Sequence, residues 1–261
     1  MTVRSYPATE MKLGPRGWLL YGLSGAGKTT LLGTFPGPIA DVNFKVEKGG
    51  DTLRGHPAVQ FYDVDVPEDV PKAIDQILSD WKDRKYQTIA IDSVTTWCEL
   101  LYRLKVMKGK TTWEDWKNWK SLIFSCIERL RALPAHVVVT AGLAGKDDET
   151  RDMKVGAPAV FGSLAVELPA RMENVIYLES ETDIRGVPRF CAYPSGKGRM
   201  IGRVRGTIPS MPIESPTYQK IVEATSKPLF HGSVPQPPPE PPPLPANGEA
   251  KPEEASAEGA R

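Results

Sequence analysis

Short apolar runs alternate along this chain with segments whose apolar residues recur at helical spacing. The predicted strands are Trp18–Tyr21, Ile39–Val46, Thr88–Ile91, His136–Ala141, Val175–Leu178 and Arg189–Ala192. Helices are predicted at Thr29–Leu32, Glu68–Trp81, Val94–Val106, Trp113–Leu133 and Leu164–Arg171. Alternation of this kind is typical of βαβ units. The sequence therefore predicts an α/β fold with a mostly parallel central sheet flanked by helices.

The composition changes after residue 232 to a run dominated by Pro, Glu, Ala and Gly. Such a segment has too little apolar surface to offset the entropy of ordering. We predict a single domain at 15–232, an N-terminal segment at 1–14 and a disordered Pro/Glu-rich tail at 233–261. Two uses of the tail stay open, a proline-rich ligand for a partner and a plain solubilising extension.

Charge and cysteine usage limit the partners and the compartment. The 261 residues carry a formal net charge of +1, so any attraction to nucleic acid must come from local patches. Cys98, Cys126 and Cys191 form no Cys-x-x-Cys pair and lie in or near apolar stretches, which favours a reducing compartment. No apolar run approaches the roughly 20 residues that span a bilayer. We expect a soluble, cytoplasmic protein with no membrane partner.

A glycine-rich loop follows the first predicted strand. Its sequence GLSGAGKT matches Gly-x-x-x-x-Gly-Lys-Ser/Thr and lies between a strand and a helix, as a phosphate-binding loop requires. Lys28 is expected to reach the β- and γ-phosphates, and the Thr29 hydroxyl to hold Mg²⁺. The predicted nucleotide-binding residues are Gly22, Leu23, Ser24, Gly25, Ala26, Gly27, Lys28, Thr29 and Thr30. Because the sequence has no Asn-Lys-x-Asp motif for guanine, ATP is the predicted nucleotide.

Carboxylates near two strand ends complete the predicted chemistry. Asp92 ends the apolar strand Thr88–Ile91 and is the predicted Mg²⁺-organising acid, while Ser93 suits a helix cap. Glu47, after the second predicted strand, is the predicted base for the attacking water. Asp41 is the alternative base. A solvated turn glutamate at position 47 and a capping aspartate at position 92 are the structural alternatives.

The segment around Asp92 resembles the core of RecA-type ATPases. The strings that carry the resemblance are TIAIDSVTTW from Thr88, LPAHVVVT from Leu133, VELPA from Val166 and GRVRGTIP from Gly202. They are similar to short single-domain RecA-like proteins of phages, implicated in single-strand annealing and homologous recombination. The resemblance covers about residues 15–225 and implies a RecA-like P-loop core. Its phosphate loop is specific only for the superfamily.

The resemblance also implies that Arg203 and Arg205 reach into a neighbouring protomer's ATP site. Residues 184–213 contain six basic side chains and no acidic one, which supports a charged function. Contact with DNA phosphates is the alternative for this stretch. A trans role requires self-association, as a ring or a filament, with the ATP site at the interface between protomers.

Two DNA-binding loops are implied at Met107–Thr112 and Gly142–Pro158. The predicted phosphate contacts are Lys105, Lys108, Lys110, Arg151 and Lys154. Trp113, Trp116 and Trp119 recur beside the first loop, and either base stacking or a core or subunit interface accounts for them. Where RecA proteins carry a glutamine that couples ATP to DNA, this chain has Thr140-Ala-Gly142, so its coupling must differ.

The sequence thus predicts an ATP- and Mg²⁺-dependent ATPase that binds single-stranded DNA and promotes annealing or strand exchange in phage recombination or replication. Single-stranded DNA, other copies of the chain and a single-stranded-DNA-binding protein are the expected partners, in the host cytoplasm if the chain is phage-encoded. Two alternatives remain: a P-loop kinase of a small molecule, and a non-catalytic ATP-binding loader or scaffold.

Overall fold

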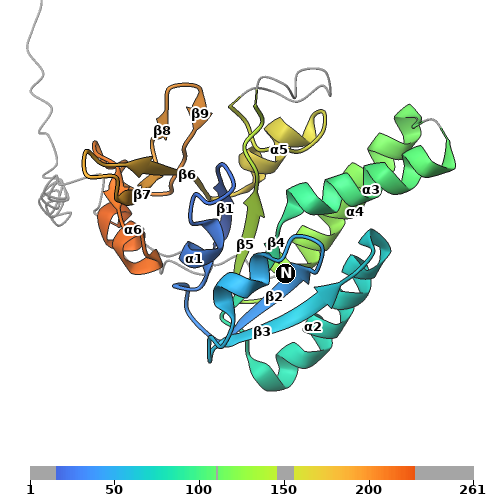
Figure 1. The fold of residues 1–261 in the computed structure, drawn as a ribbon. Coiled ribbons are helices and arrows are strands. Elements are labelled where there is room, and N and C mark those ends of the chain that lie inside the picture. Colours follow the sequence, from blue (N-terminus) through green and yellow to red (C-terminus); the bar gives the residue numbers. More distant parts are fainter. Residues whose placement is uncertain (1–15, 110, 146–155, 227–261) are drawn as a thin grey trace, which may run out of the picture. The chain divides into compact units, whose positions relative to one another are not determined.

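The computed structural model describes residues 16–109, 111–145 and 156–226 (Figure 1). Within them, eight strands form one sheet in the order β10-β7-β6-β1-β5-β4-β2-β3. Their bounds are β1 Gly17–Tyr21, β2 Ile39–Phe44, β3 Val59–Val64, β4 Thr88–Asp92, β5 His136–Ala141, β6 Asn174–Thr182, β7 Pro188–Tyr193 and β10 Ile213–Glu214. Strands β1 to β6 pair in parallel, and β7 and β10 are antiparallel additions at one edge. A separate hairpin joins β8 (Gly196–Lys197) to β9 (Met200–Ile201).

Helices cover both faces of the sheet. One face carries α2 (Val70–Arg84), α3 (Val94–Lys108), α4 (Trp113–Arg131) and α5 (Leu164–Arg171), which pack into one buried apolar cluster. The opposite face carries α1 (Lys28–Leu32) and α6 (Tyr218–Thr225), which pack into a second cluster. Short 3-10 helices occur at Gly49–Leu53 (η2) and Pro67–Asp69 (η3). The predicted mostly parallel, helix-flanked sheet is confirmed.

Strand β1 lies inside the sheet, and its side chains supply both cores. Successive strand residues point to opposite faces. Trp18 and Leu20 accordingly join the cluster under α1 and α6, while Leu19 and Tyr21 join the cluster under α2 to α5. All of β1 is buried, so packing on both faces of the sheet fixes the position at which the following loop begins.

The predicted elements agree with the structure where the apolar pattern is strong. Strand β5 and helix α5 have the predicted bounds, and the Ser93 side chain caps α3 by accepting from Thr96 N. The prediction missed β3, an edge strand whose residues are mostly half-buried or exposed. It also missed α6, a short helix of eight residues. The predicted segments 1–14 and 233–261 lie outside the described residues.

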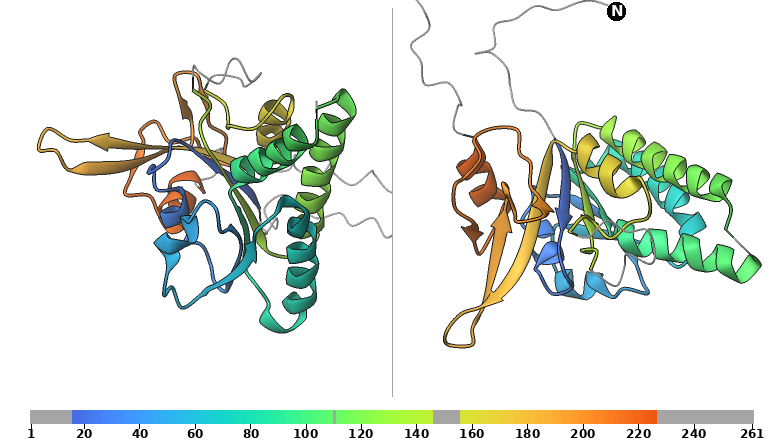
Figure 2. Two further views of the ribbon diagram at one scale, coloured as in Figure 1. Left: turned by 45° about the vertical axis from the view of Figure 1, so that its right-hand side comes forward. Right: turned by 90° about the horizontal axis from the view of Figure 1, so that it is seen from above.

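The β6–β7 hairpin extends beyond the rest of the sheet (Figure 2). Residues 184–213 contain no acidic side chain, but two of their six basic side chains have acidic partners. Lys197 forms ion pairs with Glu179 and Glu181 of β6. Arg189 pairs with Glu214 of β10. The partners come from just outside the stretch, so the pairing of strands supplies acids that a window along the sequence does not contain.

None of the helices in the described part of the chain combines the length and the apolarity needed to cross a bilayer. The three cysteines are buried as free thiols. Both findings agree with the absence of apolar spans and of Cys-x-x-Cys pairs in the sequence.

A histidine joins the start of β1 to α6. His136 Nδ1 accepts hydrogen bonds from Arg16 N at 3.2 Å and Trp18 Nε1 at 3.3 Å, so the proton of the neutral ring lies on Nε2. Nε2 in turn lies 3.1 Å from the Tyr218 hydroxyl. Burial lowers the pKa of His136. Protonation of Nδ1 would remove both accepted hydrogen bonds. This loss disfavours the charged ring and so also lowers the pKa of His136.

We therefore predict that His136 makes the fold sensitive to acid. Because the pKa of His136 is lower in the folded state, the stability that the neutral ring contributes is fully present above the unfolded-state pKa of 6.5. That stability is lost as the pH falls below this value. Denaturant unfolding of the parent should lose more free energy between about pH 7 and pH 5 than unfolding of His136→Gln, which cannot titrate there. Parallel pH profiles for the two proteins would contradict this role.

Candidate nucleotide site

The predicted phosphate loop connects β1 to α1. Gly25 and Gly27 have φ values of +77° and +86°, in the left-handed region that favours glycine. A Cβ at Gly22 would lie 2.1 Å from the carbonyl oxygen of Leu178, so a side chain does not fit there. On the far side of the loop, a Cβ at Gly27 would lie 3.2 Å from the ring of Phe190 on β7. The motif glycines thus fit both the curl of the loop and its packing between strands.

Lys28 lies over this loop. Its Nζ donates to the carbonyl oxygens of Gly22 at 3.0 Å and Leu23 at 2.9 Å. Burial lowers the pKa of the ammonium, and the charges of Asp92 and Glu47 oppose that shift. A phosphate is a stronger acceptor than a carbonyl and carries negative charge. The lysine is therefore placed to exchange its two carbonyl partners for phosphate oxygens.

Asp92 at the end of β4 joins the loop to the sheet. Its Oδ2 accepts from the Thr29 hydroxyl at 2.7 Å, and its Oδ1 accepts from the Thr140 hydroxyl on β5. Burial raises the pKa of the Asp92 carboxyl, and the two hydroxyl hydrogen bonds oppose the rise. The structure thus brings together the two predicted metal residues, Thr29 and Asp92.

The oxygens of Thr29 and Asp92 fit Mg²⁺, which prefers hard oxygen ligands and few protein carboxylates. Gly49 in η2 keeps the space beside them open, because a Cβ there would lie 3.7 Å from Asp92 Oδ2 and 3.9 Å from Thr29 Oγ1. The described ranges contain no group of three or more His, Cys, Asp or Glu residues that could hold a metal ion by itself.

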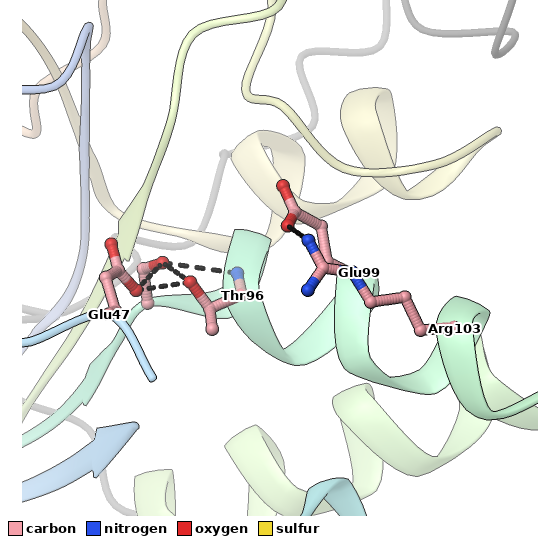
Figure 3. Close-up of polar contacts among 5 residues, drawn as sticks. Glu47, Thr96, Glu99 and Arg103 are labelled. Atoms are coloured by element: carbon pink, nitrogen blue, oxygen red, sulfur yellow. Dashed lines mark hydrogen bonds and ion pairs between the residues drawn. The ribbon is translucent and has the colours of Figure 1, made fainter. Parts of the chain in front are cut away.

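Glu47 follows β2 and contacts the first turn of α3 (Figure 3). Its Oε2 accepts from the Ser93 hydroxyl at 2.9 Å and from the Thr96 hydroxyl. Both bonds go to the same oxygen, so Oε1 is the atom left to take a proton from water. The side chain is exposed, which gives water access. Glu99 on the same helix faces Arg103 instead, and forms an ion pair with it (Figure 3).

Asp41, the alternative base, has a different environment. It lies within β2, is fully buried, and neither carboxylate oxygen has a hydrogen-bond partner. Burial raises its pKa well above the usual range, and the neighbouring Asp92 adds to the rise. A carboxyl that is excluded from water cannot contact the water molecule that attacks the phosphate. The geometry therefore favours Glu47.

Arg203 and Arg205 do not approach the phosphate loop of their own chain. Arg203 pairs through its backbone with Val175, which lies beside Leu19 in the sheet register, and its guanidinium donates to Ala170 O. Arg205 is further from the loop, where its carbonyl accepts from the Arg16 guanidinium. Both arginines thus lie toward the amino ends of β1 and β6, whereas the loop is at the carboxyl end of β1.

The predicted DNA contacts are described only in part. Lys110, Arg151 and Lys154 lie outside the described residues, as does the side chain of Lys108. The helix α3 continues to Lys108, so the first two residues of the expected loop at 107–112 are helical, and α4 begins at Trp113. Lys105 on α3 forms an ion pair with Asp115 at 2.9 Å. Hydrogen bonds from Thr112 and the Lys105 contact lower the pKa of Asp115 to about 2, so this pair stays charged at neutral pH.

Two hydroxyl groups have roles that the sequence pattern did not predict. Ser93 was assigned only a cap, and Thr96 was not considered, yet both hold Glu47. Their position in the sequence could have predicted these roles. The first turn of α3 follows Asp92 directly, so the hydroxyl groups of Ser93 and Thr96 must lie beside the carboxyl end of β4. Thr140 was noted as the residue at the coupling position, and it contacts Asp92 itself.

Comparisons with known proteins address the family. A family model described as an AAA domain matches residues 15–205. Among solved structures, a KaiC-like protein from the hyperthermophilic archaeon Pyrococcus horikoshii OT3 is similar, at 14% identity and a TM-score of 0.45, over 76% of this chain and 85% of that one. Curated proteins give no match. Because the AAA model spans more than half of the chain, the protein belongs to the AAA domain family, and it is a P-loop nucleoside triphosphatase with an α/β core.

Proposed function

We propose that the protein is an ATP- and Mg²⁺-dependent ATPase that binds single-stranded DNA and promotes strand annealing or exchange. The observation that carries the ATPase part is the convergence of Lys28, Thr29, Asp92 and Glu47 at the carboxyl ends of three parallel strands. Ligands bind open α/β sheets at this edge. The DNA part rests on the resemblance of the sequence to phage RecA-like proteins.

The residues divide the chemistry between them. The loop amides and Lys28 bind and orient the triphosphate, and Thr29 and Asp92 would hold Mg²⁺, which neutralises charge on the phosphates. Ser93 and Thr96 fix the Glu47 carboxylate through Oε2. Oε1 then accepts the proton of the attacking water. Lys28 contributes positive charge where negative charge develops.

A chain of contacts connects this chemistry to the second predicted DNA loop. Thr140 donates to Asp92, and two residues later Gly142 N donates to the Thr95 hydroxyl at 2.8 Å. The described ends of the loop pair with each other, through Leu143 and Pro158. A movement of the loop would therefore be transmitted through Gly142 and Thr95 to the residues that follow Asp92. This supports Thr140 as the coupling residue in place of the RecA glutamine.

The placement of Arg203 and Arg205 supports a role in trans. At about 3.3 Å per residue, the three positions between Leu19 and Gly22 put Arg203 about 10 Å along the strand from the loop, and Arg205 further away. Contact with phosphates in the same chain would need a large rearrangement. In a ring or filament, the same edge of one protomer can face the loop of the next.

The function is tested by ATP turnover with and without single-stranded DNA. We expect turnover that rises when an oligonucleotide is added. Lys28→Ala should lower it by about a hundredfold or more, because charge at the phosphates is lost while the core is untouched. Lys82→Ala, an exposed lysine on α2, is the matched control. Turnover that ignores DNA and requires a small-molecule acceptor would indicate a kinase and contradict the proposal.

Glu47→Gln should retain ATP binding and lower turnover by about a hundredfold or more, because the amide cannot take a proton from water. The matched control is Glu99→Gln, which removes a nearby carboxylate that contacts Arg103 (Figure 3). Binding is measured with a fluorescent ATP analogue, and turnover by phosphate release. If Glu47→Gln turns over ATP like the parent, the base is misassigned.

A mixing experiment tests the trans arginines. Lys28→Ala protein and Arg203→Ala/Arg205→Ala protein should each be inactive alone, and the mixture should recover part of the parent turnover. Hybrid interfaces join an intact loop to intact arginines. Light scattering must show that both variants form the parent's oligomers. Mixed oligomers without any recovery would count against a role in trans.

A further inference from the structure

A cavity of about 690 Å³ opens between α4 and α5, away from the phosphate loop. This volume is within the range of ligand pockets. Among the described residues, its lining is aromatic and basic and includes no carboxylate. The lining residues are Trp113, Trp116, Lys117, Lys120, Phe161, Gly162, Ser163 and Leu164.

The aromatic part of the lining has a rigid base and an open end. Trp116 is stacked on Tyr102 at 5.8 Å between ring centroids and contacts the ring of Phe161 at 4.7 Å. Trp119 closes the other side of Trp116 at 5.1 Å. Trp113, one helical turn earlier, is 84% exposed. Trp113 is therefore not part of the core, and its large indole is open to solvent, as a ring that stacks on a nucleobase needs to be.

The lysines give the cavity its preference for an anion. Lys120 is fixed by Ser163 at 3.1 Å and by Glu167 at 2.9 Å, so its charge is largely compensated. Lys117 is exposed on α4, one turn after Trp113. An exposed aromatic face beside an exposed lysine suits a ligand with a planar ring and a negative charge on one unit. An apolar protein segment would leave this lysine without a counter-charge.

The cavity is lined by described residues that follow each of the two segments expected to bind DNA. Trp113 begins α4 directly after Thr112, the end of the first segment, and Phe161 comes three residues after Pro158, the end of the second. Gly162 has a φ of +55° and open space on its Cβ side, so the backbone there leaves room for a ligand.

From these observations we propose that the cavity is a nucleobase-stacking subsite for single-stranded nucleic acid, with a base on Trp113 and its phosphate near Lys117. The inference rests on the proposed function, because it assumes a strand bound by the same protein. The predicted basic residues contact only the phosphates, whereas the subsite would contact a base. Stacking of this kind does not depend on which base is bound.

The test uses the full chain, an ATP analogue and oligo(dT), with binding followed by fluorescence anisotropy of the labelled strand. Trp113→Ala should weaken binding on the order of tenfold, the loss typical of one stacked base, and Trp113→Phe should retain most of the affinity. Lys117→Ala should lower the log–log salt slope by about 0.7, one phosphate contact. Met211→Ala, an exposed apolar residue elsewhere, and Lys82→Ala should bind like the parent.

Tryptophan fluorescence gives a second readout. The chain has six tryptophans, of which Trp18 and Trp97 are buried. Saturating oligo(dT) should quench the parent, Trp113→Ala should lose most of that quench, and thymidine monophosphate should not displace the strand.

Three outcomes overturn the subsite. If the parent binds oligo(dT) and Trp113→Ala binds equally well, the subsite is refuted while the proposed function stands. If Trp113→Ala loses self-association, measured by light scattering, the platform is a contact between copies of the chain. If the parent binds no single strand with nucleotide present, the proposed function fails, and the subsite with it.

Discussion

The Asp92 carboxylate is the point where strands β4 and β5 and the start of α1, directly after the phosphate loop, meet. It accepts one hydrogen bond from Thr29 at the start of α1 and another from Thr140 on β5. A buried carboxylate is costly unless its lone pairs are used, and these two hydroxyls use them. Because β4 lies beside β5, and β5 beside β1, the acid fixes α1 relative to two neighbouring strands. Loss of either hydroxyl would loosen the metal side of the site and leave a buried acceptor unpaired.

The same strand end organises the base. Ser93 follows Asp92 in the chain, caps α3, and donates to Glu47 together with Thr96. Asp92, the proposed metal-binding acid, and Ser93, which holds the proposed base Glu47, are therefore consecutive residues at one strand end. Asp41 is not part of this arrangement. It is buried in β2 without a hydrogen-bond partner and lies too deep to contact water. Of the two carboxylates in the β2 region, Asp41 is fully buried and Glu47 is exposed, so only Glu47 is accessible to water.

Much of this was predictable because the strongest signals are local. The GLSGAGKT motif, the apolar run ending in Asp92 and the period of the α4 pattern each occupy one stretch of sequence, and each was placed correctly. The misses depend on contacts between distant segments. The partners of Lys197 and Arg189 come from β6 and β10, and β3 is a strand only because it pairs with β2. Likewise the hold of Ser93 and Thr96 on Glu47 requires knowing that the turn after β2 faces the start of α3.

The most direct measurement is a structure of the protein with a non-hydrolysable ATP analogue, Mg²⁺ and single-stranded DNA, determined by electron microscopy. The account predicts the triphosphate on the backbone amides of residues 22–29, with Lys28 turned from the carbonyls of Gly22 and Leu23 to the phosphates. It also predicts that Glu47, still held by Ser93 and Thr96, presents Oε1 toward the γ-phosphate. A nucleotide bound away from this loop, or a Glu47 carboxylate turned away from the γ-phosphate, would contradict it.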